Sequence, residues 1–184
     1  MRNIAFILAG FIFALTLATE QAEAQWGIGA SYEIRNEDPN NGFGFRVEKE
    51  ILSGLPLLDL NMRGHFSFFN ETNRVTLQDG IRASQDLDVY DFGLAAVAGF
   101  NIGMVKPFAG LGIGRERFEL SADHQNLQSF KESNFYWNAF GGAEVSLLPF
   151  LKPFIEYRIS RLTSTDDLDV DNVGRLAVGV NLRF

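Results

Sequence analysis

Residues that could carry out chemistry occupy every second position in several stretches of this chain. Arg63, His65 and Ser67 form one such stretch, and Glu156 and Arg158 belong to another. A His two residues from a Ser could serve as general base and nucleophile if a carboxylate oriented the His. Arg and Glu side chains held together away from water would form ion pairs, or a path along which ions exchange partners. Either chemistry depends on the elements that position these side chains.

Composition argues against several other functions. The chain has 184 residues, a formal net charge of −7, no Cys and two His. The lack of Cys excludes disulfides, a Cys nucleophile, Cys-ligated zinc and iron–sulfur clusters. The two His residues are not clustered, which argues against a catalytic metal site, and the acidic charge argues against binding to nucleic acid. Because no phosphate-binding loop motif is present either, we expect neither a metal nor another cofactor.

The N-terminal residues 1–24 are expected to be a secretory signal peptide. Arg2 gives a positive start, Ile4 to Leu17 is an apolar run, and Ala22-Glu23-Ala24 fits a cleavage site. The apolar run is shorter than the roughly 20 residues of a membrane-spanning helix. Residues 25–184 would then form the mature domain.

Apolar and polar residues alternate along the mature chain. From Leu176 to Phe184, the even positions are apolar and the odd positions hold Ala, Gly, Asn and Arg. A period of two predicts a strand with one apolar face, and seven further segments share it, which predicts eight strands of about ten residues. The parity reverses after Gly114, which predicts a β-bulge near Arg115.

The predicted strands are joined alternately by short and by polar, mostly longer connections. The short ones fall at residues 53–56, 102–105 and 148–150, and the polar ones at residues 36–41, 71–86, 121–133 and 163–172. This alternation predicts an up-and-down antiparallel order. With an even number of strands, both ends of the mature chain would lie at the end with the short turns.

Two features indicate which parity faces inward. The positions that alternate with the apolar residues are rich in Gly. Gly fits a narrow interior, where long charged side chains need small neighbours. The apolar positions include aromatic residues near the strand ends. Aromatic girdles of this kind flank the lipid-facing band of transmembrane barrels. The predicted girdles comprise Trp26, Phe43, Phe68, Tyr90, Phe100, Phe135 and Trp137. The sequence therefore predicts an all-β, eight-stranded antiparallel transmembrane β-barrel. A soluble lipocalin-like barrel with a small hydrophobic ligand would have the opposite orientation.

The mature chain resembles the small bacterial outer-membrane β-barrels of the OmpA/OmpX type. In that superfamily the last strand ends with an aromatic residue, preceded by an apolar residue two positions before it and a Gly five positions before it. Phe184, Leu182 and Gly179 match this pattern, whereas Ala177 stands where the family often has a polar residue. The resemblance implies that this C-terminal signal is recognised by the barrel-assembly machinery, after passage with periplasmic chaperones.

The same resemblance implies a cellular location. It places the chain in the outer membrane of a Gram-negative bacterium, with the short turns in the periplasm and the long loops outside. The expected surroundings are outer-membrane lipid and lipopolysaccharide, and the expected state is a monomer.

In this orientation the interior of the barrel holds a charge network. Its predicted members are Arg46, Glu48, Arg63, Glu144, Glu156, Arg158 and Arg175. An eight-stranded barrel has room for side chains but not for an open pore, which favours a static, ion-paired plug. The alternative is a narrow gated channel for ions or small solutes, in which Glu48, Arg63, Glu156 and Arg158 exchange partners.

Two motifs suggest other activities. His65-Phe66-Ser67 resembles the His-x-Ser pair of outer-membrane lipid A deacylases, which makes a lipid-modifying hydrolase an alternative function. In the predicted register, however, both polar side chains point into the lumen, away from lipid acyl chains. The acidic run 166–171 within loop 163–172 resembles the start of an EF-hand calcium loop, but Asn172 replaces the turn Gly. A solvated loop is favoured there, with loose bridging of divalent ions to anionic lipid as the alternative.

These features together favour a non-enzymatic, porin-like outer-membrane protein. It would be a membrane-embedded scaffold with four exposed loops that serve envelope integrity, adhesion or loop-mediated binding. The gated channel, the lipid-modifying hydrolase and the soluble lipocalin-like barrel stay as alternatives.

Overall fold

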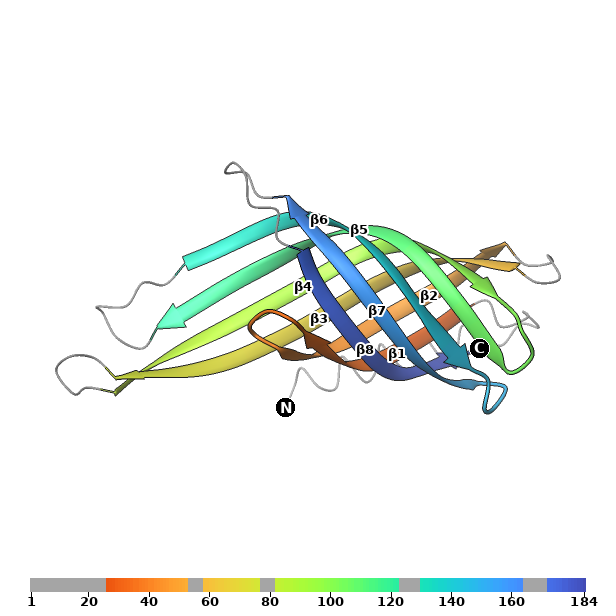
Figure 1. Cartoon of the computed structure of the whole chain (residues 1–184), viewed down its shortest axis with the longest axis horizontal. Coiled ribbons are helices and arrows are strands. Elements are labelled where there is room, and N and C mark those ends of the chain that lie inside the picture. The colour runs from red at the N-terminus through yellow and green to blue at the C-terminus, as the bar shows by residue number, and fades with distance from the viewer. Residues whose placement is uncertain (1–25, 53–57, 77–81, 123–129, 164–171) are drawn as a thin grey trace, which may run out of the picture.

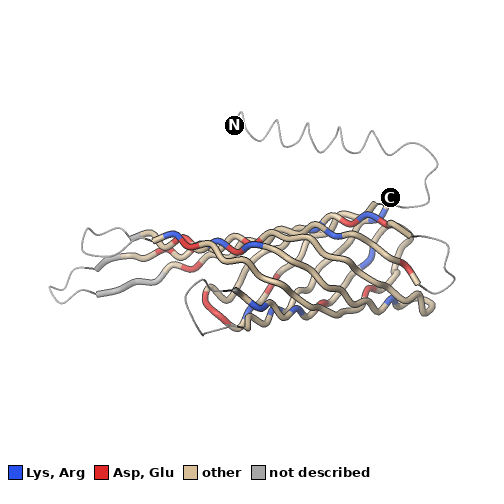
Figure 2. Tube along the Cα trace, turned by 90° about the horizontal axis from the view of Figure 1, so that it is seen from above, with Lys and Arg blue, Asp and Glu red and all other residues tan. Residues whose placement is uncertain are grey.

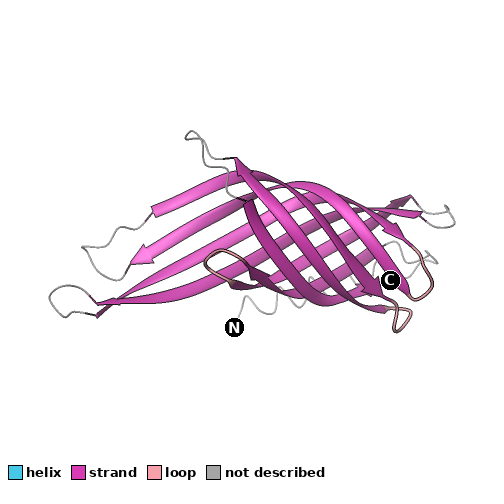
Figure 3. Ribbon diagram, viewed as in Figure 1, coloured by secondary structure: helices cyan, strands magenta, loops and turns pink. Residues whose placement is uncertain are grey.

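A computed structural model of the chain describes residues 26–52, 58–76, 82–122, 130–163 and 172–184 (Figure 1). These residues form a closed barrel in which each strand pairs with the next in sequence and β1 pairs with β8. The strands are β1 (Trp26–Arg35), β2 (Asn41–Leu52), β3 (Leu58–Thr76), β4 (Arg82–Phe100), β5 (Val105–Ala122), β6 (Phe130–Val145), β7 (Leu151–Thr163) and β8 (Asn172–Arg183). All neighbouring pairs are antiparallel (Figure 3), so the predicted eight-stranded up-and-down barrel is confirmed.

The first and last strands close the barrel through their backbones. The amide of Trp26 donates to the carbonyl of Phe184 at 3.2 Å, and the amide of Phe184 donates to the carbonyl of Trp26 at 3.0 Å. Closure satisfies the backbone groups that a sheet edge would otherwise leave unpaired. No helix among the described residues is long and apolar enough to cross a membrane.

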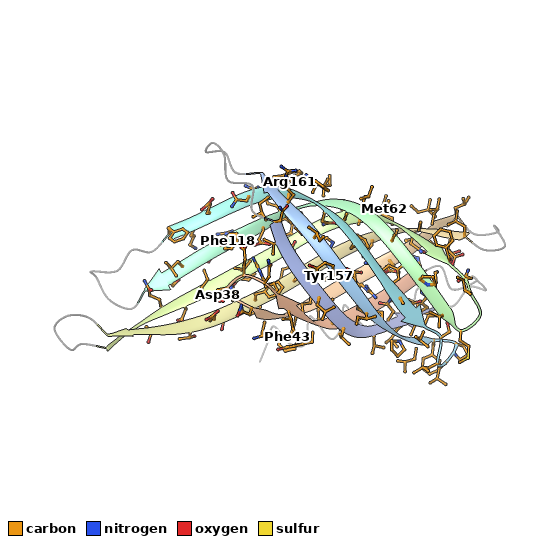
Figure 4. All side chains as sticks on the ribbon, viewed as in Figure 1. Asp38, Phe43, Met62, Phe118, Tyr157 and Arg161 are labelled. Atoms are coloured by element: carbon orange, nitrogen blue, oxygen red, sulfur yellow. The ribbon has the colours of Figure 1, made fainter. Side chains whose placement is uncertain are left out.

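The alternating sequence places apolar side chains outside and polar side chains inside. Phe43 and Leu111 are 65% and 67% exposed, whereas Arg63 and Arg175 are 1% and 2% exposed. Figure 4 shows the side chain of Met62 among those on the outer surface. A lipid-facing barrel has this arrangement. The lipocalin-like alternative, which needs the apolar parity inside, is therefore wrong.

Four of the strands are much longer than predicted. β3 and β4 have 19 residues each, β5 has 18 and β6 has 16. The predicted loop 71–86 is consequently wrong over most of its length, and the predicted loop 121–133 is wrong at both of its ends. The four strands continue beyond the rest of the barrel at the end opposite the C-terminus (Figure 1). We call residues 70–76, 82–88, 117–122 and 130–134 the sheet extension.

Polar cross-strand pairs explain why the sheet extension forms strands. Thr72 Oγ1 donates to Asp86 at 2.7 Å, and Asn70 Nδ2 donates to Asp88 at 2.5 Å. Such pairs stabilise a ladder without apolar residues. In β3 and β4 the composition of the sheet extension is that of a loop, so these parts of the strands leave no signal in the pattern of apolar residues.

The predicted bulge near Arg115 is also wrong. The register between β4 and β5 runs without a shift from Gly99↔Phe108 to Gln85↔Ala122. Phe118 faces inward and packs against the buried residues Tyr136, Leu162 and Val173. After Gly114 the apolar residues move from odd to even positions without a bulge, because the outward positions of the sheet extension need not be apolar. A register shift occurs instead on β2, between Glu50 and Leu52.

The short turns that the structure describes are tight. Ile102 and Val105 exchange backbone hydrogen bonds of 3.1 and 3.2 Å, with Gly103 at a φ of 63°. A positive φ favours Gly at this position. Three predictions fall outside the described residues: the signal peptide 1–24, the turn at 53–56 and the acidic run 166–171.

Candidate functional site

The centre of the lumen is built around the carboxylate of Glu156. Glu156 accepts hydrogen bonds from Arg46 at 3.1 Å, from Arg158 at 2.8 Å, and from Arg63. Arg63 also donates to Glu48 at 2.8 Å, its direct register partner on the neighbouring strand. The alternation of β2, β3 and β7 turns all five side chains inward, where each is at least 95% buried.

A second group lies closer to the sheet extension and is centred on Arg175. Its guanidinium contacts Asp91 at 2.6 Å, Glu33 at 3.3 Å and Glu116 at 3.6 Å. Arg35 forms a further ion pair with Glu116 at 3.0 Å. One cation therefore holds three carboxylates, and a second cation shares one of them.

The remaining inward charges lie near the short turns. Lys106 pairs with Asp59 at 2.5 Å, and Glu144 lies 3.5 Å from Arg183 and 3.8 Å from Lys152. Figure 2 shows residues of both signs distributed along the length of the barrel. Because the groups are inside and mutually paired, the arrangement is that of an ionic core rather than an open pore.

Aromatic rings lie against these charged groups. The guanidinium carbon of Arg63 lies 4.8 Å from the ring centre of Phe140 and 5.2 Å from that of Phe108. Phe108 and Phe140 form a buried cluster with Ala95 and Val97. A cation over an aromatic face gains electrostatic stabilisation, and the rings fill space that water would otherwise occupy. The interior cavity beside Arg63 is only about 10 Å³, which is at the lower limit for one water molecule.

Many of the inward glycines make room for these rings. A Cβ at Gly110 would overlap the ring of Phe140, and a Cβ at Gly142 would overlap the ring of Phe108. The same relation holds for Gly42 with Phe69, Gly114 with Tyr136, and Gly179 with Phe154. Other inward glycines give space to charged side chains, as the sequence predicts; Gly99 beside Lys106 is one of them. The space that glycines give to aromatic rings was not predicted.

All seven residues of the predicted charge network are buried in the lumen, and six of them are linked. Five make up the group centred on Glu156, and Arg183 joins Glu144 to this group because it lies 3.5 Å from Glu144 and 3.1 Å from Glu48. Arg175 belongs to the second group. Sequence reasoning missed Arg35, Lys106 and Glu116. The predicted slip after Gly114 turned Glu116 outward, whereas an unbroken period of two would have placed it inside.

His65 and Ser67 both face the lumen, yet they are not joined to each other. His65 Nε2 lies 2.9 Å from the hydroxyl of Tyr136, which in turn donates to Asp91. The hydroxyl of Ser67 accepts from Arg175 at 3.2 Å and is 1% exposed. A nucleophile needs a neighbouring base and access to substrate, and this geometry supplies neither to Ser67. Within the described residues, no group of three or more His, Asp or Glu could hold a metal ion.

The outer surface carries the aromatic residues that the sequence assigned to girdles. Trp26, Phe100 and Phe135 are 45%, 48% and 56% exposed. Phe68 and Tyr90 are partly buried because their rings pack together at 5.1 Å. Phe43 and Trp137 also face outward. Of the C-terminal signal residues, Leu182 and Phe184 face outward, whereas Gly179 faces the lumen.

Comparison with solved structures finds the same architecture in outer-membrane proteins. Neisserial surface protein A matches with a TM-score of 0.59 at 16% identity, over 86% of this chain and 96% of that chain. A major outer membrane protein from Thermus thermophilus matches with a TM-score of 0.60 at 14% identity, over 86% and 98%. Ail, the attachment invasion locus protein of Yersinia pestis, matches with a TM-score of 0.56 at 20% identity, over 86% and 96%. At these identities the likeness concerns the fold.

A sequence comparison with curated proteins finds no match. Comparison with family profiles, however, matches residues 4–184 to the outer membrane protein beta-barrel domain. The closed antiparallel barrel, its apolar outer surface and its charged lumen agree with that match. The resemblance seen in the sequence is therefore confirmed: the chain belongs to the outer membrane protein β-barrel family.

Proposed function

We propose that this protein is a non-enzymatic scaffold of the outer membrane whose sheet extension mediates binding at the cell surface. The main support is the unequal length of the strands. Among the described residues, 70–76 of β3 pair only with β4, and 130–134 of β6 pair only with β5. Unpaired strand edges can accept an extended segment of another protein.

The proposal includes how the protein reaches this place. Residues 1–24 direct export, and the barrel-assembly machinery recognises Gly179, Leu182 and Phe184 after delivery by periplasmic chaperones. The barrel is then a monomer surrounded by outer-membrane lipid and lipopolysaccharide. The sheet extension lies at the end opposite the short turns and the C-terminus (Figure 1), which is the outer end by resemblance to the family.

Removing most of the sheet extension should abolish surface binding and leave the barrel folded. The variant joins Asn70 to Asp88 and Glu119 to Lys131 through Asn-Gly turns; both are cross-strand pairs of the native register. Cells that carry it should attach to a host-cell layer as weakly as cells without the protein. Folding is checked on a denaturing gel, where a closed barrel migrates differently before and after boiling because its strands stay paired in detergent.

Attachment by the folded, shortened barrel at the native level would contradict the binding role. A second readout separates binding from envelope integrity. Sensitivity of the cells to bile salts should rise when the whole protein is deleted and stay unchanged when only the sheet extension is removed. Increased sensitivity of the shortened variant would instead assign the extension a role in the envelope.

The ion-paired lumen predicts no steady conductance. In planar bilayers the native protein, Arg63→Gln and Glu156→Gln should all give flat current traces, because aromatic rings and paired charges fill the interior. Discrete openings whose size differs between the native protein and either variant would support the channel alternative.

A further inference from the structure

Outward-facing cations gather on one side of the barrel, beside aromatic residues. Arg115 of β5 lies between Phe92 of β4 and Phe135 of β6 in the register, and Arg161 of β7 is opposite Trp137 of β6. All five side chains are exposed on the outer surface, and Figure 4 labels Arg161 near the end of the barrel where Phe118 lies. Aromatic rings together with cations are typical of the depth at which a membrane protein meets lipid headgroups.

Two of these residues, Phe92 and Arg115, border a groove of about 330 Å³. Its full lining consists of Phe92, Arg115, Arg117, Lys131, Glu132 and Ser133. Arg115 Nε donates to the neutral hydroxyl of Ser133 at 2.6 Å. Arg117 and Lys131 share the carboxylate of Glu119 at 2.7 and 3.2 Å. The lining of the groove itself holds three cations and one carboxylate, Glu132, whereas Glu119 and its register partner Asp88 lie beyond it.

An apolar groove adjoins the basic one at Phe92. It measures about 410 Å³, and the apolar residues in its lining are Phe45, Val47, Gly64, Phe66, Phe92 and Leu94. The groove exists because Gly64 stands at an outward position where the neighbouring strand positions carry large side chains. A Cβ at Gly64 would meet only Leu94 Cδ2, at 3.7 Å. The surface is therefore hollowed beside Phe66 and Phe92, which are cross-strand neighbours.

We infer that β3–β6 bind one phosphorylated, acylated lipid of the outer leaflet at a fixed position. Its phosphate lies against Arg115, Arg117 and Lys131, and one of its acyl chains lies in the groove over Gly64. Cationic side chains and phosphate form strong charge-assisted hydrogen bonds, and the adjoining apolar groove fits a chain attached to that headgroup. The inference rests on the membrane position of the barrel and is independent of the binding role of the sheet extension.

Among the side chains that the structure describes, the outward cations at this end of the barrel come from β5, β6 and β7, on one side. At the same end, outward positions described for β1, β2 and β8 carry Ile34, Phe43 and Leu176. A belt that merely attracted anionic lipid would surround the barrel evenly. A localised group of cations that continues into a hollowed apolar surface instead indicates a site for one molecule.

The test measures lipid bound to the folded protein by native mass spectrometry in a zwitterionic detergent, with bis-phosphorylated lipid A as the probe. Arg115→Gln with Arg117→Gln should weaken binding by about fivefold per cation removed, and Gly64→Leu should weaken it by filling the apolar groove. Two variants serve as matched controls. Lys49→Gln removes an outward cation that lies over Trp26, on another part of the surface, and Gly141→Leu fills an open outward position beside the carbonyl of Phe108. Both controls should bind lipid A like the native protein.

Two outcomes would overturn the inference. Equal losses in the Lys49→Gln control would mean that the overall charge attracts lipid without a site. Inorganic phosphate that competes as well as lipid A, together with an unchanged Gly64→Leu variant, would mean that the groove binds free phosphate and no acyl chain. Gel mobility before and after boiling confirms that every variant is folded. The variant that joins Asn70 to Asp88 and Glu119 to Lys131 loses the far part of the sheet extension but keeps Arg115, Arg117 and Lys131. It should still bind lipid A, which separates this site from the proposed surface function.

Discussion

Replacing Glu156 by Gln should lower the free energy of unfolding by about 3–5 kcal/mol, the usual cost of removing one partner of a buried ion pair. Glu156 is 3% exposed and contacts Arg46, Arg63 and Arg158. The amide keeps the size of the side chain but removes the negative charge that three guanidinium groups share. It also presents N–H donors to groups that are themselves donors. The loss should therefore be electrostatic, without a cavity.

The measurement is urea unfolding of the protein in phospholipid vesicles, followed by Trp fluorescence. Glu132→Gln is the control, because Glu132 is exposed and accepts a hydrogen bond from Asn134 at 3.1 Å. Its stability should stay within about 0.5 kcal/mol of the native value, as for surface substitutions in general. An equally small effect at Glu156 would show that the lumen is hydrated and that its ion pairs contribute little.

A double variant tests whether the charges act as a network. Arg158 forms its ion pair with Glu156, at 2.8 Å. In Glu156→Gln alone, three guanidinium groups lose a shared counter-charge. In the double variant Glu156→Gln with Arg158→Gln, only two do. The double variant should therefore be more stable than the sum of the two single losses implies, with a coupling of about 0.5–3 kcal/mol. Additive losses would mean that the two side chains contribute separately.

The architecture could be predicted because every strand obeys one local rule. The period of two is visible within a few residues, and it already assigns Arg63 to the lumen and Met62 to the lipid. Chain closure follows from the same pattern, since a barrel with a lipid-facing surface leaves no edge free. The strand ends are harder to predict, because the alternation loses its apolar half where β3 and β4 continue into the sheet extension.

The pairings inside the lumen could not be predicted from the sequence. Arg46 and Glu156 are 110 residues apart, and Arg175 and Glu33 are 142 apart. Which charges meet depends on the stagger of the strands around the barrel, which a single sequence does not reveal. The match of Gly110 to the ring of Phe140 depends on the same stagger. The misplacement of Glu116 has a different cause. Phe118, two residues later, is apolar but faces inward, and in the sequence this looks the same as a β-bulge that turns the following residues to the other face.

Leu111→Arg should lower the free energy of unfolding by about 2–4 kcal/mol, the cost of placing Arg on the lipid face at mid-membrane. This loss is almost as large as the one expected for Glu156→Gln. Leu111 is 67% exposed and lies on β5 between Val105, near the short turn, and Arg115, beside the outer aromatic residues. Its cross-strand neighbours are Ala96 and Ala139, which offer no polar partner. In water, the same substitution at an exposed site would cost almost nothing.

The size of this loss should depend on depth. Ile113→Arg lies closer to the native Arg115 and should cost less than Leu111→Arg, because a long cationic side chain can reach the headgroups from there. Ser121→Arg, an exposed outward position in the sheet extension, should leave stability unchanged. The measurement is again urea unfolding in vesicles, with all three variants compared in one lipid. A graded series would place the edge of the hydrocarbon layer between Ile113 and Ser121, the stretch that contains Arg115. Equal stability of all three variants would mean that the apolar outer surface does not face lipid, in conflict with the orientation on which both the lumen and the lipid site depend.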